Sequence, residues 1–416
     1  MASPLMCSED TAQMHPELVD WSPWLAVFGI FSHDGHANFR SAIRNTYLAN
    51  AGSNTSISAT FAMRGIGAAA STLEEARTHG DITFLPAHAN LTRAVGPLVS
   101  LRLWFECALA RWPAAELIGK ADDDAWIHLE GVSAHLRGTL NALRHPPHSM
   151  YDKHNSSRPH IYWGFFQTFH WHLQKGSPIG FSHSFGRYTD CSAPLQDAPR
   201  SLWEGNSTEI QPSPSSSPHM QQHAKAVTHT GLIGPFSFAR GALNFLSRPL
   251  VAELLSNTLV RAHWENTEKR NFIKGARLPW EDVYTGLGLS HAIAQRFGAE
   301  QHPIAFVDAG NRYVEGWSFT QSDSSIVYHM LTKNPTRFHL LQEWSESHHC
   351  HPLASEVKLR CSNPIYRSCI GAEWLRCRDA SDNSKCPESF SRLTDLKKLL
   401  RSGQWRPRFL QKNSSS

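Results

Sequence analysis

The chain has 416 residues, of which 41% are hydrophobic and 18% charged, so it is long and apolar enough to bury a large core. Its net charge of +4 is small and no block of Lys and Arg stands out, which makes nucleic acid a poor candidate partner. The sequence contains no apolar run of about 18 residues, the length that a membrane-spanning helix needs.

The N-terminal segment, residues 1–23, is a polar lead-in that carries acidic residues and lacks the apolar core of a signal peptide. We therefore expect either a cytosolic protein or one whose membrane anchor is absent from this sequence. Five N-x-S/T sequons agree with the second expectation, because such sequons are glycosylated in the secretory pathway.

Cysteines crowd toward the C-terminus, where residues 346–416 form a Cys-rich tail. Such a cluster indicates disulfides in an oxidising compartment or a metal site in a reducing one. The spacing contains no C-x-x-C motif, so zinc is the weaker interpretation. The clustered residues are Cys350, Cys361, Cys369, Cys377 and Cys386.

The first elements predict a strand, a turn and a helix. The apolar run 24–31 predicts a buried strand, and a polar turn that begins at Ser32 leads into a helix for which Asn38 is the expected N-cap. Arg40 and Arg44 share one face of this helix, where two guanidinium groups suit a diphosphate. Two solvated surface arginines are the alternative.

The next elements continue the alternation. Residues 57–62 predict a second strand, and a helix follows that we expect Ser71 to cap and Gly80 to end. Residues 81–85 predict a third short strand and residues 98–111 a long helix. Strands that alternate with helices favour a parallel α/β sheet.

Three consecutive carboxylates, Asp122, Asp123 and Asp124, follow the apolar run 117–121. Because Asp does not continue a buried strand, they should lie where the strand ends, at the edge where open α/β sheets bind ligands. Adjacent carboxylates repel one another unless a cation neutralises them, and oxygen ligands suit magnesium or manganese. A solvated acidic turn is the alternative interpretation.

The second half of the chain is less regular. Residues 160–169 predict an aromatic strand, and the Ser- and Pro-rich residues 190–228 predict a disordered insertion. Order should resume at 231–240, with a helix over 241–257. A short strand over 325–329 ends in a histidine.

Two later motifs have both a functional and a structural interpretation. Glu281 and Asp282 are a second acidic pair, but acidic residues also favour the first turn of a helix. His329, at a strand end, is a candidate metal ligand, although a lone histidine in such a place is more often structural.

Four sequence motifs occur in the same order as in glycosyltransferase family 31 and resemble the motifs of that family. The family comprises β-1,3-galactosyltransferases and β-1,3-N-acetylglucosaminyltransferases and includes the Fringe-type enzymes. Residues 39–47 (FRSAIRNTY) are similar to R-x-x-I-R-x-T-W, and residues 81–82 with 90–92 to D-I followed by N-L-T. Residues 120–126 (KADDDAW) are close to K-x-D-D-D-x-F, and residues 281–286 (EDVYTG) match E-D-V-x-x-G. The resemblance covers roughly residues 24–340.

The sequence departs from the family pattern in several places. The family usually has Lys where Arg93 or Ala94 falls, and the helix after Asn90 is slightly longer here. Tyr47 stands where the family usually has Trp, and residues 234–240 are only loosely similar to its G-x-G-Y-x-x-S block. Since that block helps to shape the donor and acceptor pocket, the identity of the transferred sugar stays open.

The resemblance implies an α/β fold of the GT-A type over residues 24–345, a Rossmann-like nucleotide-sugar-binding domain whose mostly parallel central sheet is flanked by helices. It also implies an inverting hexosyltransferase that uses Mn²⁺ or Mg²⁺. Such an enzyme moves galactose or an N-acetylhexosamine from a UDP-sugar to a hydroxyl of a glycan, glycoprotein or glycolipid acceptor and forms a β-1,3 linkage. Most family members act in the Golgi lumen as type II membrane proteins, so the resemblance implies that location for this protein.

The resemblance assigns roles to particular residues of this chain. The metal ligands would be Asp124, Asp122 and His329. The donor-binding residues would be Ser32, Arg40, Arg44, Lys120 and Asp123. The general base would be Asp282, with Trp280 and Glu281 near the acceptor.

Two other functions are compatible with the sequence. A catalytically silent lumenal sugar-binding protein on the same fold would bind a donor without turnover. A metal-dependent hydrolase would release sugar or phosphate without an acceptor, and it leaves the ordered family motifs unexplained.

Overall fold

The structure is a computed structural model. It describes residues 6–7, 17, 19–49, 56–93, 95–144, 160–172, 177–182, 232–258, 260–261, 264, 281–296, 304–310, 313–315, 325–330, 334–347, 359–362 and 374–379. The expected insertion at 190–228, Trp280, and three of the clustered cysteines (Cys350, Cys369 and Cys386) lie outside these ranges.

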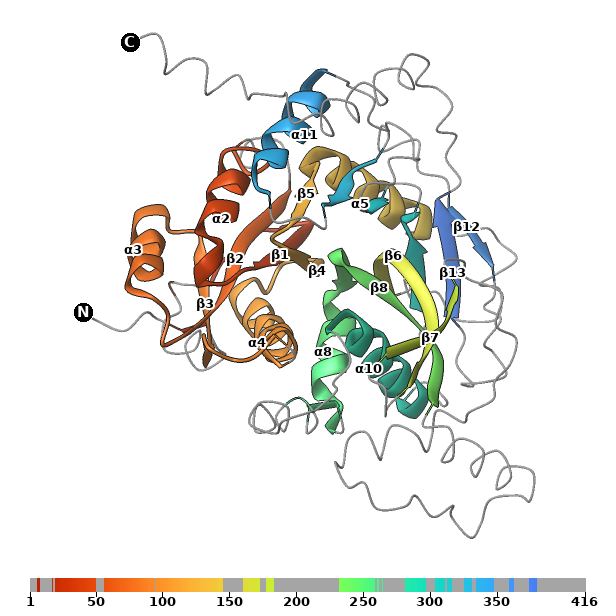
Figure 1. Cartoon of the computed structure of the whole chain (residues 1–416). Coiled ribbons are helices and arrows are strands. Elements are labelled where there is room, and N and C mark those ends of the chain that lie inside the picture. Colours follow the sequence, from red (N-terminus) through yellow and green to blue (C-terminus); the bar gives the residue numbers. More distant parts are fainter. Residues whose placement is uncertain are drawn as a thin grey trace.

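One large sheet runs through the described part of the chain (Figure 1). Its order is β12-β13-β9-β6-β8-β4-β1-β2-β3, with β7 paired to β6. The strands are β1 (Ala26–Phe31), β2 (Ile57–Ile66), β3 (Ile82–His88), β4 (Leu117–Asp122), β6 (His160–His172), β7 (Ser177–Ser182), β8 (Leu232–Ser247), β9 (Ile304–Asp308), β12 (Leu359–Ser362) and β13 (Trp374–Asp379).

Most of these strands run in one direction. The pairs within β4-β1-β2-β3 and within β13-β9-β6 are parallel, whereas β7, β8 and β12 run against their neighbours. The predicted α/β class with a mostly parallel sheet is therefore confirmed, and its strand order is compatible with a Rossmann-like fold. Two strands after residue 345, β12 and β13, extend this same sheet.

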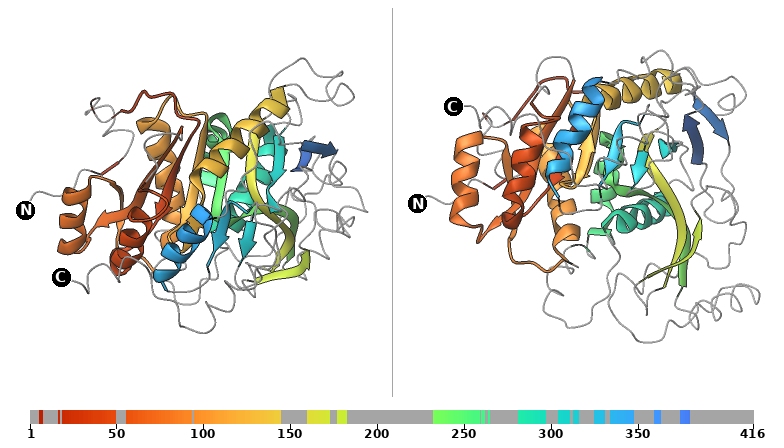
Figure 2. Two further views of the ribbon diagram at one scale, coloured as in Figure 1. Left: turned by 90° about the horizontal axis from the view of Figure 1, so that it is seen from above. Right: turned by 45° about the horizontal axis from the view of Figure 1, so that its top comes forward.

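Helices cover both faces of the sheet (Figure 1 and Figure 2). One face carries α2, α5 and α11, and the other carries α4, α8 and α10. The helices, including α3 beside the β3 edge, are α2 (Ala37–Arg44), α3 (Ala70–His79), α4 (Gly96–Arg111), α5 (Leu129–Arg144), α8 (Arg248–Ser256), α10 (Glu281–Arg296) and α11 (Thr336–Ser347).

Two apolar cores explain why the central strands read as continuous apolar runs. In β1, Val27 packs in the core under α4, α8 and α10, whereas its neighbours Ala26 and Phe28 pack in the core under α2, α5 and α11. Successive side chains of a strand point to opposite faces, so a strand buried on both faces needs apolar residues at every position. In β4, Ile118 and Leu117 divide between the same two cores.

The helix expected over 241–257 is wrong in its first part. Strand β8 continues to Ser247 and α8 begins only at Arg248. The apolar residues Ala242, Leu243 and Phe245 have a spacing that also fits a helix, but β8 lies between β4 and β6 and is buried on both faces.

Two expected helix caps are also wrong. Asn38 lies inside α2, whose N-cap is His36, and the N-cap of α3 is Ala69 rather than Ser71. Asp34 serves α3 from another element, since its carboxylate accepts hydrogen bonds from Ala69 N at 3.1 Å and from Thr72 Oγ1 at 2.7 Å. A cap supplied from a distant loop leaves no local sequence signal. Gly80 ends α3 with a φ of 68°, as predicted.

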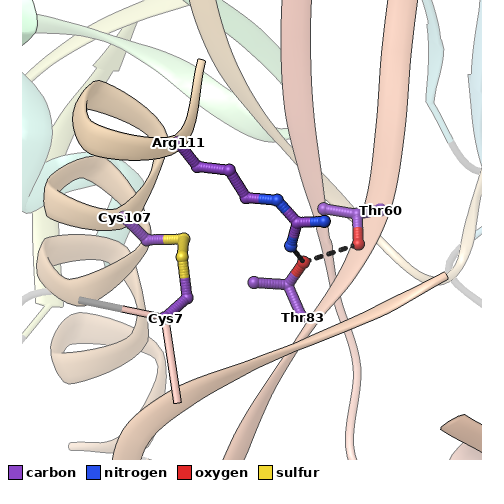
Figure 3. Close-up of a disulfide and its surroundings, with 5 residues drawn as sticks. All are labelled: Cys7, Thr60, Thr83, Cys107 and Arg111. Atoms are coloured by element: carbon purple, nitrogen blue, oxygen red, sulfur yellow. Dashed lines mark hydrogen bonds between the residues drawn. A yellow bond between two sulfur atoms is a disulfide. The ribbon is translucent and has the colours of Figure 1, made fainter. Parts of the chain in front are cut away.

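Cys7, from the expected N-terminal lead-in, is fastened to the sheet, which the sequence did not reveal. Cys7 forms a disulfide with Cys107 of α4, and Cys7 N donates to Phe84 O of the edge strand β3 at 2.7 Å. Figure 3 shows the disulfide beside a polar contact between the same layers, in which Arg111 donates to Thr83 Oγ1 at 3.1 Å. The disulfide closes a loop of 100 residues.

We expect Cys7→Ala to lower the free energy of unfolding by about 2–4 kcal/mol, because a cross-link over a long loop restricts the unfolded chain. Chemical denaturation of both proteins without reductant measures the difference. Treatment with reductant should bring the wild-type midpoint close to that of the variant. Equal midpoints for the two unreduced proteins would contradict a stabilising cross-link.

Candidate active site

The candidate site lies at the topological switch point of the sheet, between β1 and β4. From β1 the chain adds β2 and β3 on one side, then crosses back to place β4 on the other side of β1. Open α/β sheets bind ligands at the carboxyl ends of the strands at such a switch point. The segments there are residues 32–36 after β1 and residues 122–124 at the end of β4, and Phe31 is in register with Asp122.

A small second sheet brings a histidine to the aspartates. Strand β5 (Ala125–Ile127) follows the acidic turn and pairs antiparallel with β11 (Val327–His329), which pairs with β10 (Tyr313–Glu315). The register sets Ala125 opposite His329, and Met330 N donates to Asp124 O at 3.0 Å. The short strand that ends in His329 is therefore held beside the acidic turn.

Asp122, Asp124 and His329 form a group with the geometry of a metal site. His329 Nε2 lies 3.2 Å from Asp124 Oδ1 and 4.0 Å from Asp122 Oδ2, and one ligand atom from each residue lies within 4.8 Å of the others. Two carboxylates and one imidazole suit a divalent ion such as Mn²⁺, which accepts both oxygen and nitrogen ligands. The donor set thus fits the expected cofactor class.

The electrostatics of Asp124 favour an ionised carboxylate. Burial acts to raise its pKa, but the hydrogen bond with His329, the charge of His329 and the charge of Lys120 together outweigh burial. The pKa of Asp124 therefore lies below its ordinary value, and its carboxylate is ready to bind a cation at neutral pH.

Asp282 lies next to Glu281 in the first turn of α10. Burial is the largest cause that raises its pKa, the negative charges of Glu281 and Asp122 add to it, and Lys120 and the backbone N–H of Val283 oppose it. The pKa rises from 3.8 to about 7. A carboxylate with a pKa near 7 is suited to act as a general base at neutral pH.

Helix α10 is placed by a close contact with β8. Gly286 lies against the backbone of Ser237 and the Cβ of Phe238, and a side chain at this position would overlap both. The glycine of the E-D-V-x-x-G motif thus lets the helix that carries Asp282 approach the sheet.

Lys120 connects the two acidic groups. Its side chain is buried, and Nζ lies 2.6 Å from Asp122 Oδ1 and 2.8 Å from Glu281 Oε1. Lys120 therefore joins Asp122 of the candidate metal triad to Glu281 at the start of α10.

Asp123 faces the segment after β1. Its Oδ2 lies 2.9 Å from His36 Nδ1, and the ring of His36 contacts that of His33 at a tilt of 39°, with centroids 3.8 Å apart. Because Asp34 is fastened to α3, the segment that carries these histidines has a defined position. This polar contact bridges the two segments of the switch point, and no local pattern in the sequence indicates it.

Arg40 and Arg44 do not extend into the metal triad. Arg40 is fully buried, makes two hydrogen bonds to Glu75 at 2.9 Å and 2.6 Å, and donates to Ser32 Oγ and to the carbonyl oxygen of His33. Arg44 binds Glu75 and Asp81. This geometry indicates that Arg40 holds the segment after β1 in place, and it argues against direct contact of Arg40 with a diphosphate.

Gly241 is a site residue that sequence reasoning missed. A Cβ at this position of β8 would lie 2.7 Å from Asp122 Oδ2 and 2.9 Å from Lys120 Nζ. The sequence offered one clue to this glycine, its place directly after the loosely matching block 234–240. Only the pairing of β8 with β4 shows which residues it contacts.

A scan against models of known protein families finds no match. Among the described residues, no helix combines the length and the apolar character needed to cross a membrane.

Proposed function

We propose that this protein is an inverting, metal-dependent hexosyltransferase and that its α/β fold is of the GT-A type. It would move galactose or an N-acetylhexosamine from a UDP-sugar to a hydroxyl of a glycan, glycoprotein or glycolipid and form a β-1,3 linkage. One observation carries the proposal. A candidate metal triad lies near Asp282, whose pKa of about 7 suits a general base, and Lys120 pairs with Asp122 of the triad and with Glu281, the neighbour of Asp282.

Asp122, Asp124 and His329 would hold the divalent ion. When bound, this ion supplies positive charge for the diphosphate of the leaving UDP. Asp282, in its ionised form, would accept the proton of an acceptor hydroxyl as that oxygen attacks the anomeric carbon from the face opposite UDP. A single displacement inverts the anomeric centre, so an α-linked donor gives a β-linked product.

The donor would lie at the switch point. Ser32 begins the segment after β1, Asp123 bonds to His36 across the switch point, and open α/β sheets bind nucleotides in such crevices. The K-x-D-D-D and E-D-V-x-x-G motifs and their order support the same assignment. Glu281, next to Asp282, and Trp280 are the candidates for contact with the acceptor.

The Cys7–Cys107 disulfide supports an oxidising compartment, because such cross-links are rare in the cytosol. Together with the family resemblance, it supports a place in the Golgi lumen.

The test is release of UDP from UDP-galactose, UDP-N-acetylglucosamine and UDP-N-acetylgalactosamine, with Mn²⁺ and a panel of β- and α-linked acceptor glycosides. We expect release that depends on both Mn²⁺ and an acceptor, with one donor strongly preferred. Donor binding without release across the panel would replace the proposal with a silent binding protein. Equal release without any acceptor would indicate a hydrolase.

A further inference from the structure

The side chain of Lys120 is enclosed by other protein groups. Its side chain is 1% exposed, although it ends in an ammonium group that prefers water. The ring centroid of Phe31 lies 5.5 Å from Nζ, and a Cβ at Gly241 would lie 2.9 Å from it. Protein atoms therefore surround the ammonium, and two carboxylates compensate its charge.

The spacing of the K-x-D motif places Lys120 and Asp122 on the same face of β4. Ile118, two residues before Lys120, packs in the core under α4, α8 and α10, so the alternation of the strand directs all three side chains to the face that α10 covers. Glu281, the partner on α10, is 161 residues away in the sequence. The ammonium thus joins the end of a strand to the start of a distant helix.

The contact with Asp122 has a defined orientation. Lys120 Nζ lies 2.6 Å from Oδ1 of Asp122, whereas Oδ2 is the oxygen nearest His329 Nε2, at 4.0 Å. One carboxylate oxygen of Asp122 is therefore held by the lysine, while the other is directed toward His329 of the triad. Partners that orient a ligand in this way commonly change metal affinity or activity by about 10–100-fold when removed.

We propose that Lys120 is a positioning residue, which fixes the Asp122 carboxylate and the start of α10 relative to each other and does not contact the donor. The inference rests on the proposed function, because the two groups it aligns are the metal triad and Asp282. It differs from the donor-binding role that the sequence resemblance implies for Lys120.

A double-mutant cycle with Lys120→Met and Glu281→Ala tests the proposal. The readouts are kcat, KM for the UDP-sugar, the dissociation constant of UDP with Mn²⁺ present, and the unfolding temperature. If the two residues form one link, each single variant should lower kcat about 10–100-fold, and the double variant should be no worse than the more damaged single variant. The KM for the donor should change less than about threefold, since no donor contact is lost.

Two further variants separate positioning from general destabilisation. Arg102→Met removes a partly buried cation that pairs with Glu106 within α4, and it should leave kcat unchanged. Gly241→Ala keeps the charge of Lys120, but its added methyl group would displace both Lys120 and Asp122. It should therefore lower kcat, and it provides a test of the proposal if Lys120→Met does not fold.

Three outcomes would overturn the proposal. A rise of more than about tenfold in the donor KM or the UDP dissociation constant, with kcat retained, would make Lys120 a donor ligand. Additive effects of the two substitutions on kcat would exclude a shared link. A lower unfolding temperature with an unchanged kcat would show that Lys120 has only a structural role. A wild-type protein without turnover would refute the proposed function as well, whereas an active wild type with an active Lys120→Met variant refutes only the positioning role.

Discussion

Asp282→Asn should lower kcat by about 10²–10⁴-fold, the usual contribution of a general base, while leaving UDP and Mn²⁺ affinity almost unchanged. Asn has the size of Asp but cannot accept the proton of the acceptor hydroxyl. Asp282 is not part of the metal triad, so binding of the ion and of the nucleotide should survive. Calorimetric titration of UDP and Mn²⁺ beside steady-state kinetics separates these effects.

The pH dependence gives this prediction a second, independent readout. Because burial raises the pKa of Asp282 to about 7, the free wild-type protein should carry the neutral, inactive acid below pH 7. We expect kcat/KM to fall about tenfold per pH unit below that value and to level off above it. A profile that stays flat from pH 5 to 8, or an Asn variant with undiminished kcat, would remove Asp282 from the role of base.

The same pKa shift has a consequence for stability. A carboxyl whose pKa rises on folding stabilises the protein while it is protonated, and this contribution is lost as the pH rises toward 7. Asn carries no charge to bury. Asp282→Asn should therefore unfold at a higher temperature than the wild type at pH 8, and the difference should shrink toward pH 4. A gain in stability with a loss of activity is typical of a functional site.

The sequence predicted much of the fold because its strongest signals are local. The apolar runs of β1 and β4, the alternation with α2, α3 and α4, and the left-handed Gly80 at the end of α3 all follow from residues close in sequence. The three aspartates were expected at a strand end, and they lie there, with Asp122 as the last residue of β4.

The parts that sequence reasoning missed depend on distant partners. The cap that Asp34 provides to α3 and the disulfide between Cys7 and Cys107 join elements far apart in the chain. The spacing of apolar residues could not separate the end of β8 from a helix, since both faces of that strand are buried. Arg40 shows the same limit, because only tertiary structure reveals that Glu75 occupies its guanidinium group.

The members of the candidate metal triad were predicted from the sequence, but the packing that brings them together was not. Asp122, Asp124 and His329 were expected together, and the pairing of β5 with β11 brings them together. The link from Lys120 to Glu281 and the close approach of Gly241 depend on β8 and α10 packing against β4, a relation with no signature in one sequence.

Removal of the divalent ion should abolish turnover, and Mn²⁺ should restore it. Asp124→Asn and His329→Ala each remove one member of the triad, so we expect either change to weaken Mn²⁺ binding by at least about 10–100-fold. Activity at low Mn²⁺ should fall in proportion, and saturating Mn²⁺ should recover part of it for His329→Ala, which keeps both carboxylates. Calorimetry or the electron paramagnetic resonance signal of free Mn²⁺ measures the affinity directly.

Thermal unfolding tests the same site without any assay of turnover. An ion that binds only the folded protein stabilises it by about 2.7 kcal/mol at a concentration one hundred times its dissociation constant, which raises the unfolding temperature of the wild type. Asp124→Asn and His329→Ala should lose most of that rise at the same concentration, whereas the control His79→Ala, an exposed residue at the end of α3, should keep it. Activity that persists in a chelator would show that turnover does not need the ion. A full Mn²⁺ response in His329→Ala at the same concentration would show that the triad is not the metal site, because the loss of one of three ligands must weaken binding.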